Sequence, residues 1–318
     1  MAVPLRINAR RRYARLFDFV CAHQGTHHQS TLNDDERNDM QSLKSYSGGL
    51  LKQLSEIQFP SQGGKPMGLC RVIVCDLKEA VGHLPELSLD VGFNVEEVHS
   101  ALVKPNICGL YHPSLDLLSS VVEFLLPRAE SVVIGETKTI VCKPEEQFEK
   151  LGVAPMLKRF GQRVRAVDLT GDERVEVQVP NPHAIEKFLL PKTVLESDLL
   201  VNVPKVGTWR ATRLTCALKN LFGLVPQKRK YYRHHLFEGM EKVIADIAQI
   251  VKPDLNIVDA GNKVILGTDA LAVDVVACRF VDLDPLTVGY LRLVSEDRNE
   301  KLETFIKKID VAEPQIRV

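Results

Sequence analysis

The amino-acid sequence predicts an α/β fold, with a largely parallel or mixed sheet that carries helices on both faces. From Cys70 onward, apolar runs of strand length alternate with segments of helical period. The segment from Met240 to Val251 has the clearest helical spacing, with apolar residues at intervals of three and four. Such an alternation is typical of sheets whose parallel strands are covered on both sides.

The predicted elements follow one another from residue 70 onward. Seven runs are predicted to be strands: Cys70–Cys75, Ser100–Lys104, Ser131–Gly135, Arg163–Leu169, Glu173–Val179, Asp198–Val203 and Leu255–Asp259. Two further helical stripes lie between these runs: Leu118, Val121, Val122 and Leu125, then Leu214, Ala217, Leu218 and Leu221. The stretch "ALAVDVVAC" is predicted to be a helix buried on most sides, with Asp269 as its N-terminal cap.

The composition is that of an ordinary globular protein with balanced charge. The 318 residues include 41 basic and 41 acidic side chains, and 45% of the residues are hydrophobic. No apolar run approaches the roughly 18 residues of a membrane-spanning helix, so we expect no membrane partner. The seven cysteines form no CxxC pair and no zinc-ligand spacing. We therefore expect reduced thiols and a cytoplasmic location.

The first 66 residues differ in character from the rest of the chain. They mix an arginine cluster with polar, histidine-rich and acidic stretches, and show no sustained period. We interpret residues 1–66 as an atypical N-terminal extension, either disordered or the product of a mis-assigned start. The stretch "MGLCRVIVCD", which begins at Met67, has the pattern of an opening strand. The α/β domain is therefore expected to span residues 67–318.

Polar residues stand just past the ends of several predicted strands. In α/β sheets, ligands bind at the carboxyl ends of the strands. We therefore expect a crevice at that edge, with Glu136 and Asp259 as acid–base candidates. The residues expected to converge there are Lys104, Asn106, His112, Glu136, Lys205 and Asp259.

A strongly basic segment follows the predicted strand Asp198–Val203. No acidic residue lies between Asp198 and Glu238, and the basic residues in this interval are Lys205, Arg210, Arg213, Lys219, Lys228, Arg229, Lys230 and Arg233. His234 and His235 stand beside them. Because the chain as a whole is neutral, this local excess of positive charge favours an anionic partner.

A series of motifs resembles one known family. "VKPNICGLYHPSLDLL", "VVIGET", "LESDLLVNVPKVGT", "LTCALKNLFGLVP", "IADIAQIVKPDLNIVDA" and "TDALAVDVVA" occur in the order found in the domain of unknown function 362 family. The resemblance covers roughly residues 70–285. It implies a fold and site shared with proteins whose biochemistry is largely unassigned, some of which carry a ferredoxin-like iron–sulfur module. The thiolate spacing of such a module is missing here.

Two departures from the family pattern bear on function. Family members often read Pro-Lys-x-Lys-Thr-His where this chain has "PKVGTW", so Gly207 and Trp209 replace a Lys and a His. A role that depends on that His is therefore not carried over. The glycine-rich stretch after "IVDA" is also reduced, here to "GNKVILGTD".

Each remaining candidate has a structural alternative. Lys219 and Asn220 in "TCALKNLFG" either bind a ligand or lie on a solvated helix face. Asp274 interrupts an apolar run, so it either serves a ligand or forms a buried ion pair, for which Lys205 and Lys219 are the candidate partners. Trp209 either stacks on a planar ligand or packs at the rim of the core.

The two adjacent histidines are candidates for acid–base chemistry. His234 and His235 cannot easily face one pocket together, so at most one is expected to act as a general base or metal ligand. The alternative for either is a solvated residue or a helix cap.

Three functions follow from these patterns. The first is a small-molecule enzyme or binder, with a ligand whose phosphate or carboxylate groups bind in a cationic cleft. The candidate ligand-binding residues are Lys104, Asn106, His112, Lys205, Arg210, Arg213, Lys219, Asn220 and Asp274. The second is nucleic-acid binding through the basic strip "QKRKYYRHH", residues 227–235. The third is a redox or assembly accessory protein without catalysis. The sequence indicates no particular cofactor or metal.

Overall fold

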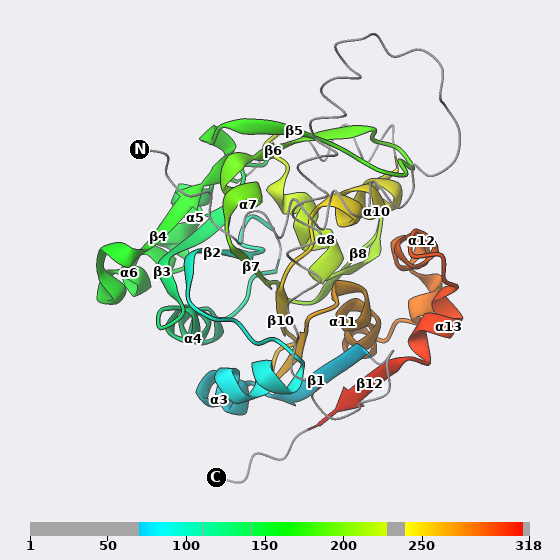
Figure 1. Ribbon diagram of the computed structural model, residues 1–318, viewed down its shortest axis with the longest axis horizontal. Helices are drawn as coiled ribbons and strands as arrows, with labels where there is room; N and C mark the ends of the chain where they lie inside the picture. Colours follow the sequence, from blue (N-terminus) through cyan, green and yellow to red (C-terminus); the bar gives the residue numbers. More distant parts are fainter. Residues whose placement is uncertain (1–69, 110, 141, 228–238, 314–318) are drawn as a thin grey trace, which may run out of the picture. The chain divides into compact units, whose positions relative to one another are not determined.

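An eight-stranded sheet forms the centre of the fold in the computed structural model, which describes residues 70–109, 111–140, 142–227 and 239–313 (Figure 1). Its strands lie in the order β12, β1, β11, β10, β7, β2, β3, β4. Their bounds are β1 Cys70–Asp76, β2 Val98–Pro105, β3 Ala129–Glu136, β4 Val164–Asp168, β7 Leu199–Val203, β10 Leu255–Asp259, β11 Lys263–Gly267 and β12 Ile309–Ala312. Strand β11 is antiparallel to both neighbours, and the other neighbouring pairs are parallel. The expected α/β fold with a mixed, mostly parallel sheet is confirmed.

Helices cover both faces of this sheet, as Figure 1 shows. Because successive side chains of a strand point to opposite faces, neighbouring residues such as Val132 and Val133 belong to different cores. One core contains α3 Leu77–Asp90, α4 Leu115–Leu125, α5 Pro144–Lys150 and α6 Val153–Leu157. The other contains α7 Lys192–Glu196, α8 Ala217–Leu221, α10 Met240–Ile250, α11 Ala270–Ala277, α12 Gly289–Glu296 and α13 Leu302–Ile306.

Two antiparallel hairpins lie outside the main sheet. One pairs β5 Arg174–Gln178 with β6 Lys187–Pro191, and the other pairs β8 Gly207–Trp209 with β9 Arg213–Thr215. Asp246 on α10 is fully buried and accepts hydrogen bonds from the backbone amides of residues 183–185, just before β6. This carboxylate therefore fastens the first hairpin to α10.

The predicted elements agree with the structure except at a few segments. All seven predicted strands are present, with ends shifted by at most two residues, and α4 and α10 coincide with predicted helical stripes. The interpretation of Leu214 as helical is wrong, because Leu214 belongs to β9 and α8 begins at Ala217. Strands β6, β8, β9, β11 and β12 were not predicted. As predicted, Asp269 caps α11 by accepting bonds from the amides of Leu271 and Ala272.

Further expectations concern membrane spans, the N-terminal extension and the basic segment. Within the described ranges, no helix has both the length and the apolar character needed to cross a bilayer. The expected extension at residues 1–66 lies outside the described residues, so the domain boundary at residue 67 stays a prediction. Lys228, Arg229, Lys230, Arg233, His234 and His235 also lie outside the described residues.

The expectation of reduced thiols is wrong for one pair of cysteines. Cys108 and Cys142 form a disulfide, with their Cα atoms 5.5 Å apart. The bond joins the loop after β2 to the loop after β3. Of the cysteines in the described ranges, Cys70, Cys75, Cys216 and Cys278 are free. Sequence spacing did not reveal the pair because the two cysteines meet only after their parallel strands are aligned.

Candidate functional site

A row of polar side chains crosses the centre of the sheet on the face covered by α8. Strand register aligns Lys104 of β2 with Asn202 of β7, and Asn202 with Asn256 of β10. All three side chains are fully buried. Buried polar groups are costly unless they are hydrogen-bonded, so their partners decide what this row does.

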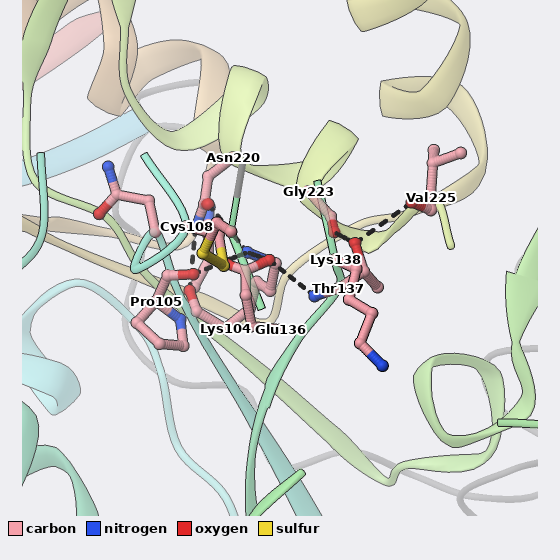
Figure 2. A network of polar contacts seen from close by, with 12 residues as sticks. Lys104, Pro105, Cys108, Glu136, Thr137, Lys138, Asn220, Gly223 and Val225 are labelled. Atoms are coloured by element: carbon pink, nitrogen blue, oxygen red, sulfur yellow. Dashed lines mark hydrogen bonds and ion pairs between the residues drawn. A yellow bond between two sulfur atoms is a disulfide. The ribbon is translucent and has the colours of Figure 1, made fainter. Parts of the chain in front are cut away.

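Lys104 is at the centre of these contacts, which Figure 2 shows from close by. Its ammonium donates to the carbonyl of Pro105 at 2.6 Å and to Oδ1 of Asn220 at 3.1 Å. Its ion pair with Glu136 has Nζ–Oε distances of 3.0 and 3.1 Å. Burial lowers the pKa of the Lys104 ammonium, and the Glu136 carboxylate opposes that change. An ammonium has three hydrogens, and three acceptors take them here.

Three asparagines extend the network along the sheet from β2 through β7 and β10 to β11. Asn220 of α8 donates to Oδ1 of Asn202 at 2.8 Å and to the carbonyl of Lys104 at 2.9 Å. Asn202 donates in turn to Oδ1 of Asn256 at 2.9 Å and to the carbonyl of Ala217 at 3.0 Å. Asn256 donates to the carbonyl of Gly267 at 3.3 Å. These hydrogen bonds join α8 to five strands. The donors of the network bond to acceptors within the network.

Close approach of the backbone at Gly223 completes the packing around Lys104. A Cβ at Gly223 would lie 2.7 Å from Nζ of Lys104 and 3.0 Å from its Cε. Thr137, which follows Glu136, donates its hydroxyl to the carbonyl of Gly223 and also contacts the carbonyl of Val225 at 3.2 Å (Figure 2). A side chain at position 223 would therefore force the Lys104 ammonium to shift away from its partners.

Asp274 caps α8 from the neighbouring helix α11. Its carboxylate accepts hydrogen bonds from the amides of Ala217 at 2.7 Å and Leu218 at 3.2 Å, and from the hydroxyl of Tyr290 at 3.3 Å. Burial raises the pKa of Asp274 to about 7, although these hydrogen bonds oppose the rise. The alternative of an ion pair with a lysine is not what the structure shows, because Lys205 pairs with Asp259 and Lys219 contacts two threonines. A carboxylate near the first amides of a helix satisfies donors that the helix itself leaves free.

Asn106, Lys205 and Asp259 meet at the carboxyl edge of the sheet, as expected. The side-chain amide of Asn106 accepts from the backbone N–H of Lys205 at 2.9 Å and donates to its carbonyl at 3.2 Å. Nζ of Lys205 lies 3.4 Å from Oδ1 of Asp259. Asp259 also accepts from the amides of Ser114 at 2.8 Å and Gly261 at 2.9 Å. These contacts join the loops that follow β2, β7 and β10.

Lys219 has a different environment from Lys104 and Lys205. Its half-buried ammonium donates to the hydroxyls of Thr212 at 2.9 Å and Thr215 at 3.0 Å, and lies 5.5 Å from the ring centroid of Trp209. No carboxylate of the described residues pairs with it. Burial lowers the pKa of the Lys219 ammonium to about 7. Its positive charge is therefore not neutralised within the described part of the chain.

Other candidates lie apart from the buried network. Arg210 and Arg213 are exposed on the β8–β9 hairpin, and Arg213 has a left-handed backbone with φ of 56°. His112 is exposed, with Nδ1 3.2 Å from the carbonyl of Pro113. The nucleic-acid hypothesis depends on the strip 227–235, of which only Gln227 is described. In the described ranges, no three His, Cys, Asp or Glu residues form a group suited to a metal ion.

One cavity of about 550 Å³ lies at the opposite edge of the sheet. It is lined by residues at the amino ends of the parallel strands, among them His99, Arg128, Glu130, Arg163 and Asp198. His99 and Glu130 contact each other there through Nδ1 and Oε2. The crevice expected at the carboxyl edge is therefore not this cavity.

The family assignment follows from comparison with known proteins. A family model described as "Domain of unknown function (DUF362)" matches residues 101–279, which is more than half of the chain. The chain belongs to this family. The matched residues include every member of the buried network from Lys104 to Asp274.

Two individual proteins are similar to this chain. A thylakoid-associated protein of Synechocystis sp. is 29% identical over 120 residues, which cover 31% of this chain and 37% of that protein. The chain thus matches well under two thirds of this relative's length. A crystal structure of a Thermotoga maritima protein has a TM-score of 0.44 and 15% identity, and the match covers 64% of this chain and 58% of that one.

The first departure from the DUF362 pattern, Gly207 and Trp209 in place of a Lys and a His, lies in strand β8 of the β8–β9 hairpin. A Cβ at Gly207 would overlap the ring of Tyr111, so this glycine lets the tyrosine lie against the hairpin. The Tyr111 hydroxyl donates to the carbonyl of Thr208 at 3.1 Å. Trp209 is 43% exposed, and its ring faces the ammonium of Lys219. The position where family members often carry a His therefore holds a partner of Lys219.

Sequence reasoning missed several residues of the site. Asn202 and Asn256 each interrupt an apolar strand, in "LLVNV" and "LNIVD", and their alignment in adjacent strands was the signal that could have identified them. Thr212 and Thr215 had no such signal, because their role depends on the turn of the β8–β9 hairpin beside α8.

Proposed function

We propose that this chain binds a small anionic molecule, with phosphate or carboxylate groups, on a surface formed by the β8–β9 hairpin and α8. We call this the Lys219 surface and define it by Trp209, Arg210, Arg213 and Lys219. The observation that carries the proposal is the half-buried Lys219 ammonium, which contacts two hydroxyls and pairs with no carboxylate of the described residues.

The electrostatic argument starts from the cost of burying an unpaired charge. Removing an ammonium from water is unfavourable unless an opposite charge lies near it. Lys104 and Lys205 have such partners in Glu136 and Asp259. Lys219 has no such partner among the residues that the structure describes, and burial lowers its pKa. A bound anion would neutralise this charge and favour the protonated lysine.

The neighbouring side chains suit the recognition of an anion that carries an organic group. Arg210 and Arg213 are exposed on the same hairpin, and guanidinium groups bind phosphate and carboxylate in a bidentate manner. Trp209 offers an exposed aromatic face beside Lys219 for a planar part of the ligand. Lys104, Glu136 and Asn220 are not included, because their donors and acceptors are already used within the network.

The test is a thermal-shift screen of phosphorylated and carboxylated metabolites on the full chain. A ligand at 100 times its Kd should stabilise the folded protein by about 2.7 kcal/mol. We expect wild type to be stabilised and Lys219→Met to lose the shift. Without ligand, Lys219→Met should be at least as stable as wild type, because it removes a desolvated charge.

A matched control separates the surface from general charge effects. Lys158 is exposed and follows α6 on the other face of the sheet, so Lys158→Met removes the same charge elsewhere. This variant should keep the ligand shift. If every stabilising ligand acts equally on wild type and Lys219→Met, binding at the Lys219 surface is refuted.

A further inference from the structure

We propose that Lys219 is a nucleophile that forms an imine with the carbonyl group of its anionic ligand, an aldehyde or ketone that also carries a phosphate or carboxylate. This inference rests on the proposed function and specifies the chemical class of the ligand. It assigns Lys219 a covalent role rather than a purely electrostatic one.

The hydrogen-bond geometry distinguishes Lys219 from Lys104. The Lys104 nitrogen has three acceptors, which match the three hydrogens of an ammonium. Among the described residues, the Lys219 nitrogen has two, the hydroxyls of Thr212 at 2.9 Å and Thr215 at 3.0 Å. A neutral amine has two hydrogens and one lone pair. The two threonines can therefore hold the hydrogens of a neutral Lys219 and leave its lone pair free to attack a carbonyl carbon.

The protonation state supports this reading of the geometry. Burial lowers the pKa of Lys219 to about 7. At pH 7.5 about three quarters of such a group is neutral, compared with about one in a thousand for an ordinary lysine. Desolvation is a recognised means of activating lysine toward carbonyl compounds. Among the described residues, no acidic group lies close enough to raise the pKa of Lys219 again.

The reaction balances without any additional reagent. The Lys219 nitrogen forms a bond to the carbonyl carbon, and the carbonyl π electrons move to oxygen to give a carbinolamine. The oxygen then leaves as water with the two hydrogens of the original amine, and the C=N bond forms. No electron donor or acceptor is required. The hydroxyl of Thr215 lies 3.0 Å from the nitrogen and can relay protons in both steps, whereas the hydroxyl of Thr212 donates to the carbonyl of Leu214 and serves to hold the amine.

The anionic group would be held by the rest of the Lys219 surface. Arg210 and Arg213 supply guanidinium groups on the hairpin, and the Trp209 ring lies beside the reacting nitrogen. Formation of the imine removes the amine as an anion-binding group, so the arginines would keep the phosphate or carboxylate bound. A neutral aldehyde should consequently react more slowly than an anionic one.

Imine trapping with sodium cyanoborohydride tests the inference on the full chain. The probes are pyridoxal 5′-phosphate, which carries both an aldehyde and a phosphate, and pyridoxal, which lacks the phosphate. After reduction, peptide mapping by mass spectrometry gives the labelling rate of each lysine. At pH 7.5 we expect Lys219 to react with pyridoxal 5′-phosphate about tenfold faster than the exposed Lys158, because its larger neutral fraction outweighs its lower basicity. Pyridoxal should label Lys219 several-fold more slowly.

The variant Lys219→Arg separates this inference from the proposed function. It keeps a cation, so it should retain stabilisation by anionic ligands, but it cannot form the imine. If wild type and Lys219→Arg are both stabilised while Lys219 is labelled no faster than Lys158, the covalent role is wrong and anion binding stands. If pyridoxal labels Lys219 as fast as its phosphate ester does, anion recognition is wrong. Preferential, phosphate-dependent labelling at Lys219 supports both.

Discussion

Removing the buried ammonium of Lys104 should destabilise the protein strongly. In Lys104→Met, the nearly buried Glu136 carboxylate loses its counter-ion, and the acceptors on Asn220 and Pro105 lose their donor. Breaking one side of a buried ion pair costs about 3–5 kcal/mol, because the remaining charge is left uncompensated. With an m-value of about 3 kcal/mol/M, the urea midpoint should fall by about 1–1.7 M.

The double variant Lys104→Met with Glu136→Leu tests the origin of this cost. It removes both charges, so it should be less destabilised than the sum of the single variants by about 2–3 kcal/mol. Some loss should persist, since the Asn220 and Pro105 acceptors stay buried without their donor. Urea unfolding followed by circular dichroism measures all four species, with Lys158→Met as the control for loss of a lysine charge. Additive losses, or a cost below about 1 kcal/mol for Lys104→Met, would refute the reasoning.

Four more predictions concern individual residues. Gly223→Ala should lower stability by about 1–3 kcal/mol because its Cβ would meet Lys104, and an unchanged melting temperature would contradict this. Asp274 has a folded-state pKa raised to about 7, so its contribution to stability is present below pH 3.8 and is lost as the pH rises through 7. Urea unfolding at pH 5 and pH 8 should show this loss in wild type and not in Asp274→Asn. Cys108→Ser should cost about 4 kcal/mol, because the disulfide closes a loop with a sequence separation of 34 residues; equal melting temperatures with and without dithiothreitol would argue against it. Binding of an anion at pH 8 should take up as much as about 0.9 proton as Lys219 becomes charged, measured by calorimetry in buffers of different ionisation enthalpy, and Lys219→Arg should take up almost none.

Much of the fold could be predicted from the sequence because local pattern determines it. Buried strands such as Leu255–Asp259 are short apolar runs, and α10 has a clear amphipathic period. Strand β12 has four half-buried residues and β8 has three residues, so neither has enough pattern to be distinguished from a loop. Strand β11 was missed because "KVILG" follows β10 after a tight turn at Gly261, where φ is 85°.

The candidate site could be predicted only where it follows the strand ends. Lys104, Glu136, Lys205 and Asp259 were expected at the carboxyl edge from strand direction alone, and they lie there. The partners of these residues depend on how distant segments are aligned in the fold. No local pattern in a single sequence indicates that alignment. Asn220 reaches Lys104 across a separation of 116 residues, and Asp274 reaches Ala217 across 57. Asp274 pairs with helix amides rather than with a lysine because α11 places it beside the first residues of α8.

The short helix α8 links the structural network to the proposed binding surface through two consecutive residues. Neighbouring positions on a helix point about 100° apart, so Asn220 faces the sheet while Lys219 faces the β8–β9 hairpin. Asn220 is held by Lys104 and Asn202, and Asp274 holds the first amides of the same helix. Five residues of helix have little stability of their own, so these buried contacts determine where α8 lies. The network that pairs the charge of Lys104 therefore also positions Lys219, which pairs with no carboxylate of the described residues, and a rigid support of this kind is what a reactive side chain requires.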